Sequence, residues 1–216
     1  MGKKIKKIVL IGQSQKFITL TQNQFTDANI IVIPWRSSRD QAKKIRYCRY
    51  KKIDLIIVCG FDYRSSLYSY EKYISVNVSF PLNLIREIST SKTRIVYIST
   101  LRASKKYTWS RYQYAKNELA IQLSKEFRAF KMLYTPTIIN QSGSADIYGG
   151  IFTRLIFNSL NKVGFLRSIT MNSLKRNFLK KISKKQTQGR VLALKPRFLA
   201  IRRPLFLDRL LRLICG

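Results

Sequence analysis

The chain has 216 residues, of which 45% are hydrophobic and 12% aromatic, enough apolar material for one full-sized domain with a packed core. It contains no histidine, which excludes His-dependent hydrolysis and His-ligated zinc or haem, and we expect no metal site. The 42 Lys and Arg residues against 10 Asp and Glu give a net charge of +32. Such a charge favours phosphate-bearing partners, namely RNA, an anionic membrane surface or a nucleotide, although an A/T-rich genome that favours Lys codons would produce the same excess.

The cysteines and the N-terminal residues bear on the compartment. Cys48, Cys59 and Cys215 are scattered without a CxxC pair, which favours a reducing, cytoplasm-like environment. Residues 1–7 are basic, but the apolar stretch 8–11 behind them is too short for a signal peptide. No apolar run approaches the roughly 20 residues of a membrane-spanning helix. We therefore expect a cytoplasmic protein, either soluble or peripheral to the inner face of a membrane.

Over the first two-thirds of the chain, short β-branched runs alternate with longer amphipathic stretches, which is typical of a parallel α/β sheet. The runs predict strands at residues 8–11, 29–33, 53–58, 94–98 and 131–134. The stretches between them predict helices at residues 15–25, 38–51, 70–88 and 109–127, with Ser37 or Ser38 capping the second. The clear strands are continuous apolar runs, as expected where helices cover both faces of a sheet. The sequence thus predicts a Rossmann-like, doubly wound α/β fold.

The character of the chain changes near residue 140. We expect a Rossmann-like nucleotide-binding domain over residues 1–140 and a small, basic C-terminal lobe over residues 141–216. The lobe is predicted to contain a helix, a basic stretch near a solvated loop, a last strand and an amphipathic tail helix, at residues 150–160, 172–186, 191–194 and 205–214 respectively. The tail helix either closes the core or docks on a membrane surface or a partner.

The sharpest local signal is Tyr112-Gln-Tyr-Ala-Lys116. Tyr112 and Lys116 are four residues apart on a predicted helix, so that both side chains project from the same face. A lysine ammonium beside a phenol stabilises the phenolate and lowers the pKa of the tyrosine from about 10 toward neutrality. Tyr112 is therefore a candidate general acid/base in a chain that has no histidine.

Three further polar side chains occur near this pair in the predicted fold. Ser99 and Thr100 directly follow a buried strand, where side chains emerge at the carboxyl edge of the sheet. Thr100 lies twelve residues before Tyr112, far enough for a loop to bring its hydroxyl beside the phenol. Asn77 lies on an otherwise apolar helical face and is predicted to hydrogen-bond to the neighbouring strand or to a water molecule, with or without a catalytic purpose.

In this order, these elements resemble the short-chain dehydrogenase/reductase superfamily over roughly residues 5–140. The segment Tyr112 to Glu118 is similar to the tyrosine–lysine helix of its extended branch, the NAD(P)-dependent epimerases and dehydratases that act on sugar nucleotides, and residues 75–84 resemble another helix of that branch. The resemblance implies that Tyr112 exchanges a proton with the substrate, and that Lys116 lowers its pKa and holds the nicotinamide ribose. It further implies that Thr100, or else Ser99, bonds the substrate oxygen.

The same resemblance makes Asn77 the anchor of a helix and of a water molecule in a proton relay. It also implies a cofactor site at the first turn, Gly12 to Thr19, where Ser14 and Lys16 would help to hold phosphate. The turn departs from the family, because the positions expected to be the second and third glycines carry side chains. Either Lys16 and Thr19 at the start of a helix compensate by favouring phosphate, or the pocket is vestigial.

Arginines and serines after the second predicted strand bear on the choice of cofactor. The segment Arg36-Ser37-Ser38-Arg39 suits a 2′-phosphate, with Arg36 and Ser37 as the cofactor-binding candidates, so NADP is favoured over NAD. The alternative is that Arg36 and Arg39 are ordinary surface charges.

Two functions follow from the sequence. The first is an NAD(P)-dependent oxidoreductase, epimerase or dehydratase of a nucleotide-linked sugar, with a role in surface polysaccharide biosynthesis and the homodimer common in that superfamily. The alternative is a non-catalytic relative that serves as a basic structural or binding subunit, with its charge facing RNA or anionic lipid. The charge supports the alternative, while the tyrosine–lysine pair supports the enzyme.

Overall fold

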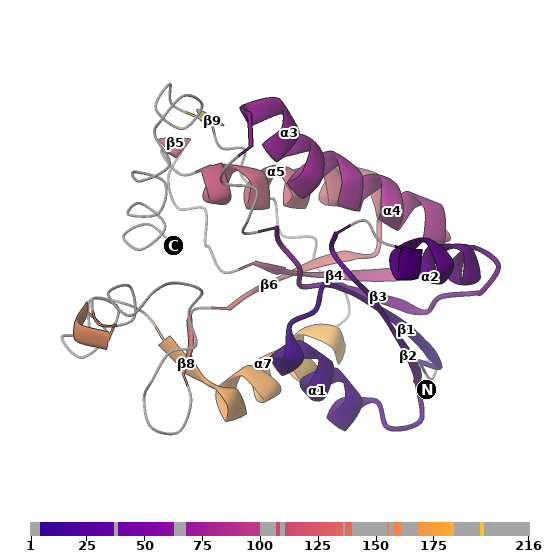
Figure 1. Ribbon diagram of the computed structural model, residues 1–216. Coiled ribbons are helices and arrows are strands. Elements are labelled where there is room, and N and C mark those ends of the chain that lie inside the picture. The colour runs from indigo at the N-terminus through magenta and orange to yellow at the C-terminus, as the bar shows by residue number, and fades with distance from the viewer. Residues whose placement is uncertain are drawn as a thin grey trace.

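A computed structural model of the chain shows a central five-stranded parallel sheet with the strand order β2-β1-β3-β4-β6 (Figure 1). It describes residues 5–36, 39–62, 68–99, 107–108, 111–135, 137–139, 155, 158–160, 168–183 and 195–196. The strands of the sheet are β1 (Lys7–Ile11), β2 (Asn29–Ile33), β3 (Leu55–Val58), β4 (Arg94–Ser99) and β6 (Phe130–Tyr134). The α/β, Rossmann-like fold class predicted from the sequence is confirmed.

Helices cover both faces of this sheet. Above it in Figure 1 lie α2 (Arg39–Arg49), α3 (Tyr70–Ile74), α4 (Phe80–Ile88) and α5 (Arg111–Glu126), and below it lie α1 (Gln15–Gln24) and α7 (Met171–Ser183). Each face has its own buried core: Val9, Ile56 and Ala115 belong to the first, and Leu10 and Ile57 to the second. The continuous apolar runs of β1, β3 and β4 follow from this arrangement, because helices cover both faces of these central strands.

The helix predicted over residues 70–88 is present, but it changes its winding on the way. Between α3 and α4, residues Ser75–Ser79 form a π-helical turn, labelled η2. A proline ring clashes with the carbonyl group four residues earlier, and Pro81 stands four residues after Asn77. The π turn thus coincides with the place where Pro81 disfavours regular α-helical winding.

The segment after residue 140 contributes to the sheet's lower cover. The basic stretch expected near a solvated loop forms α7, whose Leu174 and Phe178 are fully buried in the lower core. The amphipathic spacing of these two residues was the signal for a helix. Most of the predicted helix 150–160, the strand 191–194 and the tail helix 205–214 lie outside the described residues.

Two small parallel pairs of strands complete the described chain. Their members are β5 (Tyr107–Thr108) with β9 (Lys195–Pro196), and β7 (Thr137–Ile139) with β8 (Ser168–Thr170). None of the helices within the described ranges combines the length and the apolar character needed to cross a bilayer.

Candidate functional site

The strand order places a topological switch point at the carboxyl ends of β1 and β3. The chain passes from β1 to β2 on one side and then returns across β1 to β3, so that the topology reverses between these two strands. Ligands of doubly wound sheets bind at such a reversal, outside the carboxyl ends of the strands. Gly12 and Gly60 follow these two strands, and their backbones lie close together.

Gly12 and Gly60 permit this approach because they lack side chains. The φ angle of Gly12 is +122°, and a Cβ atom there would lie 2.5 Å from the Gly60 backbone nitrogen. A Cβ on Gly60 would lie 2.2 Å from Cε3 of Trp35, whose buried indole packs against Gly60 from the upper face. The segments that follow β1 and β3 are thus in contact at the switch point, with the Trp35 indole packed against them.

The turn between β1 and α1 has the polarity that a phosphate requires. Helix α1 begins directly after Ser14, has no acidic residue in its first turn, and is not capped by the Ser14 side chain. The N-terminus of a helix with these properties favours an anion. Gln15 is exposed and donates to Thr19 Oγ1 at 3.4 Å, so its side chain runs along α1 rather than across Gly12. The turn can therefore accept an anion at the N-terminus of α1.

Lys116 reaches the carboxyl end of β4 from α5. Its side chain is buried, with an exposed fraction of only 4%, and Nζ donates to the backbone oxygen of Ile98 at 3.1 Å. The ammonium also lies 5.1 Å from the ring centroid of Tyr97 and 5.8 Å from that of Phe61. The hydrogen bond and these cation–π contacts offset part of the cost of burying a charge.

Tyr112 lies one helical turn before Lys116 and on the same face of α5. The Lys116 ammonium is 5.9 Å from the centroid of its ring, and the Phe61 ring stands edge-on to it with centroids 4.6 Å apart. Both side chains are buried, so the charge acts on the phenol in a medium that screens it less than water does. This arrangement can stabilise a phenolate at Tyr112.

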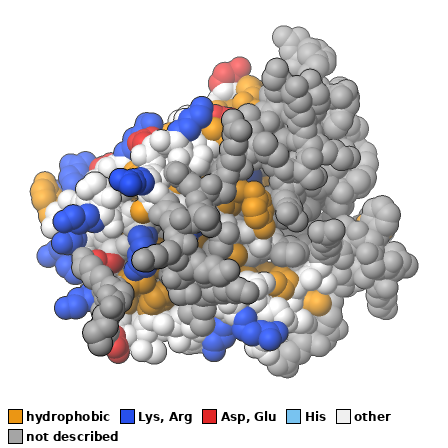
Figure 2. Space-filling view, turned by 180° about the vertical axis from the view of Figure 1, so that it is seen from behind, with side chains coloured by type: hydrophobic (Ala, Val, Ile, Leu, Met, Phe, Trp, Pro, Cys, Tyr) orange, Lys and Arg blue, Asp and Glu red, His pale blue; other side chains and the backbone are white. Residues whose placement is uncertain are grey.

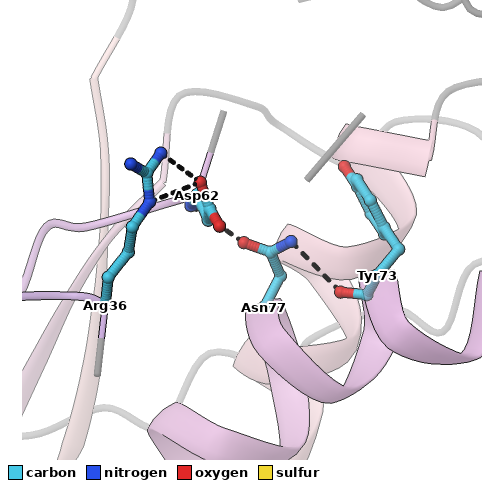
Figure 3. A network of polar contacts seen from close by, with 4 residues as sticks. All are labelled: Arg36, Asp62, Tyr73 and Asn77. Carbon is cyan, nitrogen blue, oxygen red and sulfur yellow. Dashed lines mark hydrogen bonds and ion pairs between the residues drawn. The ribbon is translucent and has the colours of Figure 1, made fainter. Parts of the chain in front are cut away.

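Asn77 joins the π turn to the segment after β3 (Figure 3). Its side-chain oxygen accepts a hydrogen bond from the backbone N–H of Asp62 at 2.9 Å, and its amide nitrogen donates to the Tyr73 backbone oxygen at 3.1 Å. The side chain is almost completely buried. Asn77 therefore holds the segment after β3 against the π turn, through a bond to a residue beyond the strand and not to the strand itself.

Arg36 and Asp62 form an ion pair between the segments that follow β2 and β3 (Figure 3). The Asp62 side chain is 2% exposed and the Arg36 side chain 43% exposed, and Arg36 Nε donates to Asp62 Oδ1 at 2.9 Å. The Nη2 group of the same guanidinium donates to the same oxygen. Arg36 thus ties the end of β2 to the end of β3, and its charge is matched by that of a buried carboxylate.

Cys59 directly follows β3 and packs against the lower core. Burial raises the pKa of its thiol to about 12, although the nearby Lys116 charge and a hydrogen bond from the Ser14 backbone N–H act in the opposite direction. The Sγ atom lies 3.6 Å from the backbone oxygen of Ile11. At neutral pH the group is therefore a protonated, unreactive thiol.

The structure brings several of the predicted site residues to one edge of the sheet. These residues are Gly12, Ser14, Arg36, Asn77, Ser99, Tyr112 and Lys116. Ser99 is buried at the end of β4, and its backbone oxygen accepts a hydrogen bond from the Thr135 N–H at 2.7 Å. Lys16 is half-buried in the first turn of α1. Thr100 and Ser37 lie outside the described residues.

Sequence reasoning missed the residues after β3 that complete this edge. Gly60, Phe61 and Asp62 directly follow a buried strand, so the rule that singled out Ser99 after β4 also applies to them. Trp35 was passed over at the end of β2 in favour of its neighbour Arg36. The signal was present in each case, but their partners lie far away in the sequence.

Comparisons with known proteins agree on the fold. No protein-family model matches the chain, and no curated protein sequence matches it. A crystal structure of ADP-L-glycero-D-manno-heptose-6-epimerase from Helicobacter pylori is similar with a TM-score of 0.54 and 9% identity, over 83% of this chain and 74% of that chain. A short-chain dehydrogenase family protein from Francisella tularensis is similar with a TM-score of 0.54 and 13% identity, over 91% of this chain and 98% of that one. The chain therefore has the Rossmann-like fold of the short-chain dehydrogenases and reductases.

Proposed function

We propose that the protein is an NAD(P)-dependent oxidoreductase, epimerase or dehydratase of the extended short-chain dehydrogenase/reductase type. The observation that supports this most directly is the buried ammonium of Lys116, held at the carboxyl end of β4 one helical turn from the phenol of Tyr112. A scaffold protein gains nothing from a charge in this position, because burying it costs free energy. An acid/base site gains a tyrosine that ionises near neutral pH.

In the proposed reaction each residue has a separate task. Tyr112 exchanges a proton with a substrate hydroxyl or carbonyl oxygen, and Lys116 stabilises the phenolate and holds a ribose hydroxyl. Ser99 or Thr100 donates a hydrogen bond to the same substrate oxygen. Asn77 is a positioning residue, since its two hydrogen bonds fix the end of β3 and the backbone of the π turn.

The nicotinamide cofactor supplies hydride transfer when it is bound, and the chain supplies the site that holds it. We place its phosphates at the Gly12–Ser14 turn and the N-terminus of α1, with Lys16 beside them. Arg36 would contact a 2′-phosphate through the part of its guanidinium that does not bond Asp62, which favours NADP. Because Asp62 neutralises much of this charge, we expect the preference over NAD to be modest.

The proposed substrate is a nucleotide-linked sugar, and the proposed role is in surface polysaccharide biosynthesis. This substrate class follows from the likeness of residues 112–118 to the epimerase and dehydratase branch. The similarity in fold to the heptose epimerase is in line with it. We propose that residues 135–143, which follow β6 in the sequence, contact the sugar.

Cofactor binding tests the proposal. Trp109→Phe leaves Trp35, which packs against Gly60 at the switch point, as the single tryptophan. NADPH binding can then be measured by energy transfer from Trp35 to the dihydronicotinamide. In this background Lys116→Met is expected to weaken NADPH binding about tenfold, as the loss of one charge-assisted hydrogen bond would. Lys125→Met, an exposed position on the same helix, is the matched control and should leave binding unchanged.

Loss of binding must be distinguished from loss of fold. Far-UV circular dichroism and the urea midpoint of Lys116→Met should stay close to those of the parent, since methionine fills the volume of the lysine stem. Tyr112→Phe should bind NADPH normally and lose turnover of a nucleotide sugar. The absence of energy transfer at millimolar NADPH and NADH, or equal binding by the two lysine variants, would refute the proposed function.

A further inference from the structure

Helix α2 presents two different faces. One face, formed by Gln41, Ile45 and Cys48 at helical spacing, packs against the sheet and its upper core. Gln41 fixes the helix to the end of β2 by donating to the backbone oxygen of Pro34 at 2.7 Å. The apolar side of α2 is therefore fully used inside the molecule, and the opposite side is left for other contacts.

The outward face of α2 carries cations at regular spacing. Residues 39–52 contain seven Lys or Arg residues and one Asp. Arg39, Lys43 and Arg46 are exposed at positions i, i+4 and i+7, so they form one stripe along the helix. Among the described residues no ion pair involves these three. Figure 2 shows Lys and Arg side chains gathered along the left edge of the molecule, the side on which α2 lies.

The acidic groups near this stripe are already matched with other cations. Asp40 pairs with Lys44 at 2.9 Å, and Glu87 on α4 pairs with Arg49. The Glu87 carboxylate raises the pKa of the Arg49 guanidinium through this pairing. Neither carboxylate therefore forms an ion pair with Arg39, Lys43 or Arg46. These three cations are left as adjacent donors for the phosphates of a polyanion.

Two tyrosine rings interrupt the cations at the C-terminal end of α2. Tyr47 is 48% exposed, and Tyr50, directly after the helix, is 76% exposed. The Lys51 ammonium lies 5.4 Å from the centroid of the Tyr47 ring. Flat exposed rings beside free cations are the two components of surfaces that bind unpaired nucleic acid, because the rings stack on bases while the cations contact phosphates.

We propose that the outward face of α2, with Arg39, Lys43, Arg46, Tyr47 and Tyr50, binds single-stranded nucleic acid. The chemistry favours this partner over a bilayer, since the apolar face that an interfacial helix would insert is buried against the sheet. It also favours a single strand over a duplex, because the base faces that stack on tyrosine are hidden within a duplex. The proposal is independent of the cofactor site and of the proposed function.

Fluorescence anisotropy with labelled oligouridylate and oligothymidylate, titrated with the full chain, tests this surface. The triple variant Arg39→Gln/Lys43→Gln/Arg46→Gln should bind more weakly. It should also reduce the slope of log affinity against log salt concentration by about 2, since each phosphate contact on a single strand contributes about 0.7. The matched control, Lys125→Gln/Lys175→Gln/Arg176→Gln, removes the same charge from exposed positions on α5 and α7 and should retain the parent slope.

The tyrosines separate stacking from a general attraction to anions. Tyr47→Leu/Tyr50→Leu should weaken oligonucleotide binding about tenfold with the salt slope unchanged, because leucine is apolar but has no aromatic face. Equal losses in the α2 triple variant and its control would overturn the proposal in favour of diffuse charge. So would undiminished binding by the double leucine variant, equal affinity for a duplex of the same length, or binding to phosphatidylserine vesicles but not to the oligonucleotides. NADPH titration of Lys43→Gln/Arg46→Gln, which keeps Arg39, should match that of the parent, so failure here leaves the cofactor proposal standing.

Discussion

The turn after β1 and the ends of β3 and β4 meet at the same edge of the sheet, yet they are built differently. In the turn, Gly12 stands at the first glycine position of a motif that usually has three, and the other two positions carry side chains. The Ser14 side chain makes no hydrogen bond that caps α1. At the ends of β3 and β4, polar side chains are almost fully buried and hydrogen-bonded; these are Asp62, Asn77 and Lys116. The part that would hold phosphate is thus sparse, and the part that would perform chemistry is densely supported.

This difference indicates where each half derives its specificity. Phosphate binding at a helix N-terminus uses backbone N–H groups and the helix dipole, so side chains in the turn can change without removing it. A buried ammonium or carboxylate has no such freedom, because each needs a particular partner in a particular place. We therefore expect substitutions in the turn to act through the backbone, and substitutions at the strand ends to act through side-chain pairs.

The largest expected effect is that of Gly12→Ala. A Cβ atom at a φ of +122° is strained and would lie 2.5 Å from the Gly60 backbone, which cannot rotate away. We expect the free energy of unfolding to fall by about 3 kcal/mol in urea denaturation. Ser14→Ala in the same turn is the control, and its effect should stay within about 0.5 kcal/mol because no cap hydrogen bond is lost. Similar values for the two variants would contradict a turn defined by its backbone.

Removal of the charge at Arg36 should have the next largest effect. Arg36→Gln leaves the buried Asp62 carboxylate without its guanidinium partner, and we expect a loss of about 1–2 kcal/mol, reduced because Arg36 is half exposed to water. Lys44→Gln breaks the exposed pair with Asp40 and should change the free energy of unfolding by less than about 0.5 kcal/mol. Two equal, small losses in urea denaturation would mean that the strand-end pair is no stronger than an ordinary surface pair.

At neutral pH Cys59 should give the smallest effect of the three, because its ionisation changes the free energy of unfolding only above pH 9. Its thiol pKa is about 12 in the folded chain against 9.0 for an ordinary cysteine, so the folded state keeps the proton longer. Its contribution to stability is complete below pH 9 and is lost as the pH rises toward 12, by about 1 kcal/mol per pH unit or less. The difference in unfolding free energy between the parent and Cys59→Ala should follow that window. A difference that is flat from pH 8 to 11 would show that the thiol ionises as freely in the folded chain as in the unfolded one.

Local patterns predicted most of the regular elements. The strand at residues 29–33 has the predicted bounds, and α1 and α5 lie within a residue or two of theirs. Three features escaped: the π turn at Ser75–Ser79, the helix α7, and the residues after β3. The π turn coincides with the place where Pro81 disfavours regular α-helical winding, and α7 is a helix because Leu174 and Phe178 find the lower core. The local signals, Pro81 and the spacing of Leu174 and Phe178, were present in both segments, but only the packed structure shows the winding at the π turn and the core that α7 covers.

The sequence by itself determined which segments would be buried strands and that Tyr112 and Lys116 share one face of a helix, because apolar runs and the helical repeat are properties of neighbouring residues. Only the tertiary structure decided that the Lys116 ammonium would bond Ile98 and that Arg36 would pair with Asp62. Strand order determines which chain ends meet at the edge of the sheet, and it is settled by packing between segments distant in sequence.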